Sequence, residues 1–236
     1  MKKSFMLGLI LLVLTFSLAG CSNSITNRQT ESSNAEKTQA IPPASKASQA
    51  NKEGKNALVV YFSLPETTNP DHMTKEESNS TVIIDGKVLG NTQYVAYLIQ
   101  ANTGADLFRI EPKTPYPTEH KKLVTLAKEE QQNKVRPALA ANVENLDQYK
   151  VVFLGYPNWW GDMPMVVYSF LESHDLSGKT IIPFNTHGGS GFSNTINTIA
   201  ALQPKATIVK NGFSVSRDTV QNCAEDVASW VKELKY

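Results

Sequence analysis

From residue 57 onward, short apolar runs alternate with longer stretches in which apolar residues recur at helical spacing. The apolar runs are 57–62, 105–110, 151–154, 180–184 and, more weakly, 206–209. Runs of this kind are typical of strands that are buried on both faces of a sheet. The stretches with helical spacing are 93–101, 119–132, 165–172, 195–202 and 219–234. This alternation predicts a five-stranded parallel sheet with helices on both faces, and ligands beyond the carboxyl ends of the strands.

A long segment, 64–89, separates the first predicted strand from the helix that should follow it. Such connections usually take about two to six residues. Residues 81–89 are Thr-Val-Ile-Ile-Asp-Gly-Lys-Val-Leu, which predicts a small hairpin with a type I′ turn at Asp85-Gly86. The polar half, 66–80, is expected to be a loose surface excursion. We therefore interpret 64–89 as an insertion in a loop of the folded domain, 57–236.

The first 20 residues have the pattern of an export signal. Two lysines precede an apolar stretch, 5–18, that is shorter than the roughly 20 residues a membrane-spanning helix needs. The segment is followed by Cys21 and ends in Leu-Ala-Gly, which resembles the lipobox of bacterial lipoproteins. That resemblance implies cleavage before Cys21 and a lipid on its thiol, with two or more acyl chains for stable anchoring. The alternative is an ordinary signal peptide followed by a chance cysteine.

Residues 21–56 are rich in Ser, Asn, Gln, Thr, Ala and Lys and contain almost no large apolar side chains. A segment of this composition cannot bury enough surface to offset the entropy of ordering it. We expect a disordered, lipid-anchored linker, and about 35 flexible residues would give it a reach of roughly 30–35 Å. The folded domain would then stand off the outer face of the bacterial cytoplasmic membrane, in the cell envelope.

Composition and motifs exclude several classes of function. The chain is 41% hydrophobic and 19% charged with a net charge of +1, so it lacks the basic footprint of nucleic-acid binding. It contains no Gly-x-Ser-x-Gly elbow, no Gly-x-x-x-x-Gly-Lys-Ser/Thr loop and no Gly-x-Gly-x-x-Gly motif. The four histidines have no metal-like spacing with cysteines or acids. Apart from Cys21, the chain has only Cys223, whose helical stretch indicates a buried, inert thiol.

Three loops at the predicted carboxyl ends of strands carry candidate binding residues. The first combines Ser63, directly after the first strand, with Gly90-Asn91-Thr92 at the start of a helix. Unpaired N–H groups and the helix dipole favour an anion there, while glycine lets the backbone approach closely. Asn and Thr add side-chain partners. The alternative is a helix N-cap with nothing bound.

The second loop, 155–164, has the sequence Gly-Tyr-Pro-Asn-Trp-Trp-Gly-Asp-Met-Pro. The adjacent Trp159 and Trp160 are costly to expose, and a flat aromatic ligand stacked on them would explain their presence. Pro157 and Gly161 would hold the loop rigid and let backbone groups reach that ligand. The alternative is a loop that the two indoles pack onto its own domain.

The third loop, 185–191, has the sequence Asn-Thr-His-Gly-Gly-Ser-Gly and precedes a helix that starts near Asn194. Three glycines in four positions permit close backbone approach to a planar ligand. His187 could hydrogen-bond that ligand, but we favour the interpretation that it caps its own loop.

Together these motifs resemble the flavodoxin-like proteins of bacteria, in particular a lipoprotein branch of that family. The motifs are Tyr61-Phe62-Ser63, Gly90-Asn91-Thr92, Gly155-Tyr156-Pro157-Asn158-Trp159-Trp160 and Thr186-His187-Gly188-Gly189-Ser190-Gly191-Phe192. The resemblance covers residues 57–236 and implies a three-layer α/β sandwich with strand order 2-1-3-4-5 and FMN as cofactor. It also implies that Ser63, Asn91 and Thr92 contact the phosphate and that 157–161 and 186–191 border the isoalloxazine. The insertion departs from the family pattern and leaves open which other hydroxyls bind phosphate.

The function that this resemblance implies is redox chemistry on FMN at the extracytoplasmic face of the membrane. Three alternatives remain, in order of preference: an oxidoreductase for a small molecule such as a quinone, an electron carrier with a redox partner protein, and a non-redox lipoprotein that acts as a binding or interaction module. Stacking on indole and a nearby carboxylate, Asp162, would disfavour the anionic reduced flavin and lower its potential. The sequence indicates no catalytic residue and no metal ligand.

Overall fold

The computed structural model describes residues 56–234. The predicted signal peptide, the lipidation site at Cys21 and the linker up to residue 55 lie outside the described residues. Among residues 56–234, no helix combines the length and the apolar content needed to cross a bilayer.

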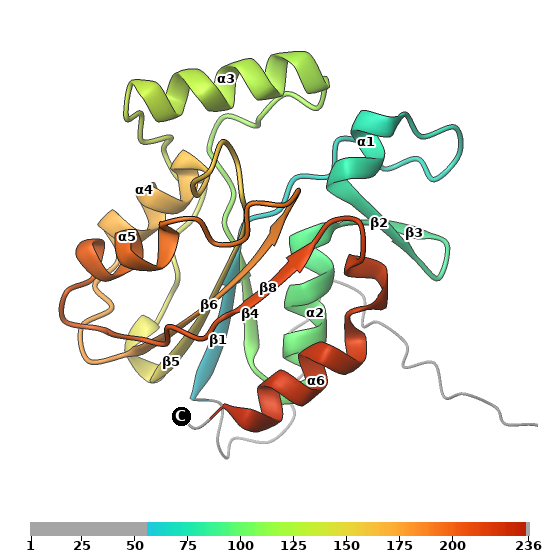
Figure 1. The fold of residues 1–236 in the computed structure, drawn as a ribbon. Helices are drawn as coiled ribbons and strands as arrows, with labels where there is room; N and C mark the ends of the chain where they lie inside the picture. Colours follow the sequence, from blue (N-terminus) through green and yellow to red (C-terminus); the bar gives the residue numbers. More distant parts are fainter. Residues whose placement is uncertain (1–55, 235–236) are drawn as a thin grey trace, which may run out of the picture. The chain divides into compact units, whose positions relative to one another are not determined.

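A parallel sheet forms the centre of the domain (Figure 1). Its strands, in chain order, are β1 (Ala57–Tyr61), β4 (Asp106–Arg109), β5 (Val151–Pro157), β6 (Thr180–His187) and β7 (Thr207–Ile208). In space they follow the order β4-β1-β5-β6-β7, and every pairing among them is parallel. This is the order 2-1-3-4-5, so the predicted doubly wound α/β architecture is confirmed.

The fifth position of the sheet is filled by two strands instead of one. Both β7 and β8 (Phe213–Ser216) pair with β6, β7 near its start and β8 near its end. Ile181 of β6 pairs with Ile208 of β7, and Phe184 of β6 pairs with Phe213 of β8. The segment that joins β7 to β8 therefore has two residues more than the part of β6 opposite it. Pro183, which lies in this gap on β6, has no N–H to donate to a neighbouring strand. The sequence pattern predicted only the first of the two pieces.

Helices cover both faces of the sheet (Figure 1). On one face lie α2 (Asn91–Thr103) and α6 (Ala224–Glu233), which contact each other, and on the other lie α4 (Met165–Ser173) and α5 (Thr195–Leu202). Two short 3-10 helices, η1 (Leu146–Gln148) and η2 (Val220–Asn222), lie in the connections, and η2 occupies the start of the single helix predicted over 219–234. Successive strand residues point to opposite faces, so β1 and β5 bury side chains in both layers.

Helix α3 (His120–Gln132) is an exception, because it lies across the carboxyl ends of the strands (Figure 1). Its inward side presents Leu123, Ala127 and Glu130, which are buried. Leu123 belongs to the main apolar core beneath the helix. The helix thereby covers the edge of the sheet at which doubly wound folds bind their ligands.

The insertion contains a helix and a hairpin. The hairpin pairs β2 (Thr81–Ile84) with β3 (Lys87–Gly90), and φ is positive at both turn residues, 50° at Asp85 and 74° at Gly86, as a type I′ turn requires. The predicted hairpin is therefore confirmed. The expectation of a loose excursion over 66–80 is wrong at its end, where α1 (Lys75–Ser80) begins with a reciprocal capping box between Thr74 and Glu77.

Candidate functional site

A cavity of about 320 Å³ lies at the carboxyl ends of the strands and is lined in part by residues of α3. It opens where β1 and β5 lie side by side in the sheet. From β1 the chain passes through α2 to β4, which lies on one side of this pair, and from β5 it passes through α4 to β6, which lies on the other side. The strand order therefore reverses between β1 and β5. Ligands of doubly wound folds bind at such points, and the volume falls within the usual range for small-molecule sites.

The three loops that the sequence singled out converge on this cavity. Ten of the predicted residues line it: Ser63, Asn91, Thr92, Pro157, Asn158, Trp159, Trp160, Thr186, His187 and Gly188. The other five, Gly90, Gly161, Gly189, Ser190 and Gly191, are not among the lining residues. Two of these support the loops: the Asn158 amide donates to the Gly191 carbonyl at 2.9 Å and accepts from the Gly161 N–H at 3.0 Å.

The end of β1 and the start of α2 form one wall of the cavity. Here Gly90 is required by close packing, because a Cβ at that position would lie 2.2 Å from the Ser63 hydroxyl oxygen. The hydroxyl groups of Thr92 and Thr186 are 2.8 Å apart and join the first turn of α2 to the end of β6. The unpaired N–H groups and the positive end of the helix dipole make this wall suitable for an anion.

The side chain of Asn91 has one of its two polar atoms bonded within the protein. Its amide nitrogen donates to the Asn79 carbonyl at 2.9 Å, which fixes the orientation of the amide group. Its amide oxygen is buried and has no partner within the described part of the chain. The side chain thus offers an unmet acceptor, suited to a ligand hydroxyl, while the backbone N–H of Asn91 is the donor left for an anion.

The two tryptophans line the cavity and also pack the loop onto the domain. The Trp159 ring makes edge-on contacts with Phe62 and Tyr116, at centroid distances of 5.4 and 5.6 Å. Trp160 is 50% exposed, and its indole N–H donates to the Val124 carbonyl of α3 at 3.1 Å. The indoles therefore pack their loop onto the domain, as the second alternative proposed, and they also line the cavity. Stacking of a flat ligand on them stays a prediction.

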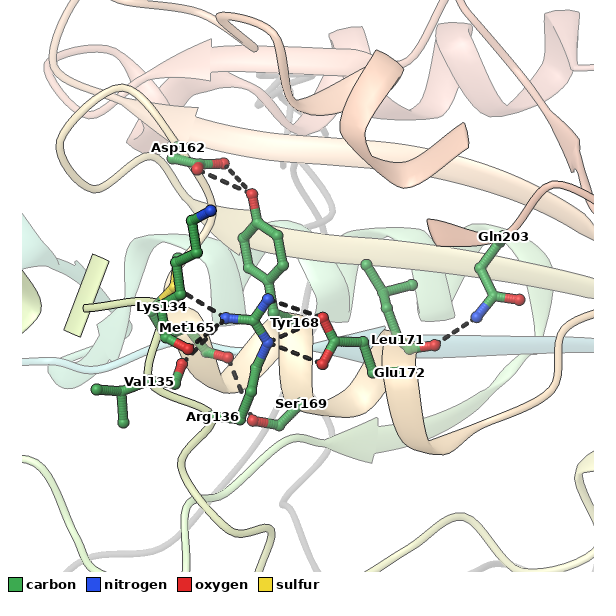
Figure 2. Close-up of polar contacts among 10 residues, drawn as sticks. All are labelled: Lys134, Val135, Arg136, Asp162, Met165, Tyr168, Ser169, Leu171, Glu172 and Gln203. Carbon is green, nitrogen blue, oxygen red and sulfur yellow. Dashed lines mark hydrogen bonds and ion pairs between the residues drawn. The ribbon is translucent and has the colours of Figure 1, made fainter. Parts of the chain in front are cut away.

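Asp162 does not lie where the sequence argument placed it. Its carboxylate accepts hydrogen bonds from the Tyr168 hydroxyl at 2.9 and 3.0 Å (Figure 2). It also accepts one from the Met163 N–H at 2.7 Å. It is not among the residues that line the cavity. The expectation of a carboxylate from Asp162 beside a bound ring is wrong, because the side chain turns toward α4.

His187 lines the cavity and caps its own loop, as the sequence argument favoured. Its Nδ1 accepts a hydrogen bond from the Gly189 N–H at 2.9 Å. Burial lowers the pKa of His187, which favours the neutral imidazole. A backbone N–H can only donate, so Nδ1 carries no proton and the neutral ring holds its proton on Nε2.

Nine lining residues escaped the sequence argument. They are Leu64, Glu66, Asn79 and Ser80 from the insertion, His120, Leu123, Val124 and Ala127 from α3, and Arg217 after β8. The Glu66 carboxylate lies 2.9 Å from His120 Nδ1 and so joins the insertion to α3. Burial raises the pKa of Glu66, and the hydrogen bond from His120 opposes that rise. No local sequence signal marks these residues, because their elements meet only in the folded chain.

The comparisons with known proteins agree with this geometry. The flavodoxin family profile matches residues 82–234. A candidate flavoprotein from Bacteroides eggerthii is 27% identical, with a TM-score of 0.56, and the match covers 76% of this chain and 97% of that one. A second, from Bacteroides uniformis, is 25% identical with a TM-score of 0.53 over 77% of this chain and all of that one.

The fold recurs at lower identity. A flavoprotein from Lactobacillus acidophilus, crystallised in complex with FMN, is 13% identical with a TM-score of 0.50 and is covered over 95% of its length by 70% of this chain. No curated protein matches the chain. On the family profile, the strand order and the position of the cavity, the chain belongs to the flavodoxin family.

Proposed function

We propose that this chain binds FMN in the cavity at the carboxyl edge of its sheet and serves as a redox protein. The observation that carries the proposal is the convergence of three separate loops on one cavity at the reversal of strand order. One of its walls is a helix N-terminus suited to a phosphate, and another is a pair of indoles suited to a flat ring.

The residues present fit this cofactor. Ser63, Thr92 and the N–H groups at the start of α2 would hold the phosphate, and Gly90 gives them room. Trp159, Trp160 and 186–188 would border the ring. When bound, FMN supplies the ability to accept and release one or two electrons.

Other residues of the chain prepare the site without taking part in electron transfer. Leu123 and Ala127 of α3 present apolar side chains to the cavity, where they would pack against a bound ligand. The unmet amide oxygen of Asn91 supports a ligand that carries hydroxyl groups. The proton on Nε2 of His187 provides a donor in the cavity wall.

The absorption spectrum of the purified full-length chain tests the proposal. We expect a yellow protein, or a colourless one that acquires a flavin spectrum and quenches FMN fluorescence when FMN is added. A chain that leaves the spectrum and fluorescence of added FMN unchanged at saturating concentrations would refute it. That result would favour the alternative, a non-redox lipoprotein that acts as a binding or interaction module.

The flavin could serve a reductase or an electron carrier, and we favour an oxidoreductase that acts on a small molecule. Residues of α3 and of the insertion line the cavity beside the three loops, and they would contact a small molecule bound there. Glu66 and His120, which lie 2.9 Å apart in the same wall, are side chains of the kind that serve as general acids and bases. Steady-state oxidation of NADPH with a quinone acceptor would support the reductase, whereas reduction only by a partner protein would support the carrier.

We further propose that the protein acts in the cell envelope, anchored to the outer face of the cytoplasmic membrane by lipid on Cys21. The motif around Cys21 and the apolar stretch before it support this location. Replacing Cys21 by Ala is expected to move the protein from the membrane fraction to the soluble fraction. Unchanged membrane association of that variant would contradict the proposal.

A further inference from the structure

Three arginines lie in the described part of the chain, and the side chains of two of them form hydrogen bonds with other residues of the protein. The Arg109 guanidinium donates to the Ser63 carbonyl at 2.9 Å and lies 3.7 Å from the Glu111 carboxylate. Arg136 donates to both carboxylate oxygens of Glu172 at 2.7–2.9 Å, and its guanidinium covers the Tyr168 ring (Figure 2). Both guanidinium groups donate hydrogen bonds within the protein, although Arg109 Nε has no hydrogen-bond partner in the described part of the chain.

Arg217 is different. It follows β8 directly and lines the cavity. Within residues 56–234 its side chain makes no hydrogen bond, and its ion pair with Asp218 is long, at 3.9 Å, to a carboxylate that is 79% exposed. An ion pair of this kind contributes little, because water and salt screen it. The guanidinium donors of Arg217 are therefore available to a ligand, and no lysine or other arginine lines the cavity.

The chain around Arg217 is adapted to bring the guanidinium into the cavity wall. The Arg217 N–H donates to the His187 carbonyl at 2.8 Å, which holds the residue beside the end of β6. A Cβ on Gly188 would lie 3.0 Å from the central carbon of the guanidinium and 3.2 Å from one of its nitrogens. A side chain at this position would crowd the guanidinium, which has room beside glycine.

Arg217 shares the cavity with the anion-binding wall, the name we use for the wall formed by Ser63, Asn91 and Thr92. Thr186, which bonds the Thr92 hydroxyl in the first turn of α2, is only two residues before Gly188. Arg217 lines the same cavity as Ser63, Asn91 and Thr92, and both its guanidinium and the start of α2 attract negative charge.

We propose that Arg217 binds the phosphate group of the flavin and makes the site selective for FMN over riboflavin. The inference rests on the proposed function, because it concerns the same cavity. A planar guanidinium presents two parallel donors that match phosphate oxygens, and this geometry adds specificity as well as affinity. Glu66 is the acidic residue of the cavity wall, and its partner His120 is the first residue of α3.

The test compares the affinities of FMN and riboflavin for the full-length chain and its Arg217→Gln and Arg217→Lys variants. The loss of a charge-assisted phosphate contact is expected to weaken FMN binding by roughly 10- to 100-fold in Arg217→Gln. Riboflavin lacks the phosphate, so its affinity is expected to change less than about twofold on the same reasoning. Arg217→Lys keeps the charge without the fork and is expected to recover part of the FMN affinity.

Lys232→Gln, on α6, is the matched control, because it removes one positive charge outside the cavity. It is expected to leave both affinities unchanged. The dependence of FMN affinity on salt should become shallower in Arg217→Gln but not in the control.

Unchanged FMN affinity in Arg217→Gln would overturn the inference. Equal losses for FMN and riboflavin would also overturn it, because they would place the guanidinium at the ring. In both cases the unaltered protein still binds FMN, so the proposed function stands. An unaltered protein that binds neither flavin would overturn the proposed function and this inference together.

Discussion

The contact between Gly90 and Ser63 allows a quantitative test of the anion-binding wall. A Cβ added in Gly90→Ala would lie 2.2 Å from the Ser63 hydroxyl oxygen, 3.2 Å from the Ser63 Cβ and 3.3 Å from Pro65. The backbone at Gly90, with φ of −72° and ψ of 147°, suits alanine, so the substitution acts through crowding and not through backbone strain. The Ser63 side chain must move, although it is only 2% exposed.

The structure sets the expected magnitudes of a double-mutant cycle. Gly90→Ala should lower the free energy of unfolding by about 1–3 kcal/mol, as is usual for overpacking. Ser63→Ala should leave stability nearly unchanged but weaken FMN binding by roughly 10- to 100-fold, the value of one charge-assisted hydrogen bond. In the double variant the contact at 2.2 Å disappears and only the two contacts beyond 3 Å remain, so most of the stability should return. The FMN affinity should stay low.

Chemical denaturation and fluorescence titration with FMN provide the two readouts of this cycle. The double variant should lose less free energy of unfolding than the two single variants together, because Ser63→Ala removes the hydroxyl oxygen that the new methyl group would displace. If the stability losses of the single variants simply add, the close contact is not the cause. If Ser63→Ala binds FMN as tightly as the unaltered chain, the hydroxyl does not belong to the phosphate site.

Three further predictions concern groups outside the anion-binding wall. Burial raises the pKa of Glu130 against the opposing hydrogen bond from Tyr116, so the folded chain binds a proton that the unfolded chain releases. The unaltered chain should therefore lose free energy of unfolding relative to Glu130→Gln as pH rises above 4.5. Denaturation of both proteins at several pH values measures this difference, and a difference that stays constant with pH would contradict the prediction. Asp162→Asn should lower the free energy of unfolding by about 1–3 kcal/mol, because the Asp162 carboxylate accepts hydrogen bonds from Tyr168. It should leave the flavin potential unchanged within a few millivolts, because Asp162 does not line the cavity. A shift of tens of millivolts in a redox titration would refute this. Burial raises the pKa of Cys223 to about 12, so iodoacetamide should modify it only after unfolding, and mass spectrometry that finds it labelled in the native protein would disprove burial.

The architecture follows from local patterns in the sequence. Apolar runs such as 151–154 are typical of a strand covered on both faces, and the helical stretches between them favour parallel connections. The Asp85-Gly86 pair specifies its turn through the positive φ that both positions require. The same reasoning located ten cavity residues, because the carboxyl ends of parallel strands necessarily share one edge of the sheet.

Local patterns fail where a feature depends on contacts between distant segments. The strand β8 escaped detection, since its four residues follow a break in pairing opposite Pro183 and form no continuous apolar run. The helical pattern of α3 predicted a helix but not that it would lie over the strand ends. The position of Asp162 was also misjudged, because the loop sequence does not reveal the hydroxyl of Tyr168 that holds the carboxylate.

The sequence by itself determined the main alternation of strands and helices, without α1 and β8, and the three loops that meet at one edge of the sheet. These features depend on the period of apolar residues and on turn chemistry, which act over a few residues. Only the tertiary structure decided which residues close the cavity: Glu66 from the insertion, His120 from α3 and Arg217 after β8. Their placement depends on packing between segments that are 54 or more residues apart in the chain, and such packing leaves no periodic trace in the sequence.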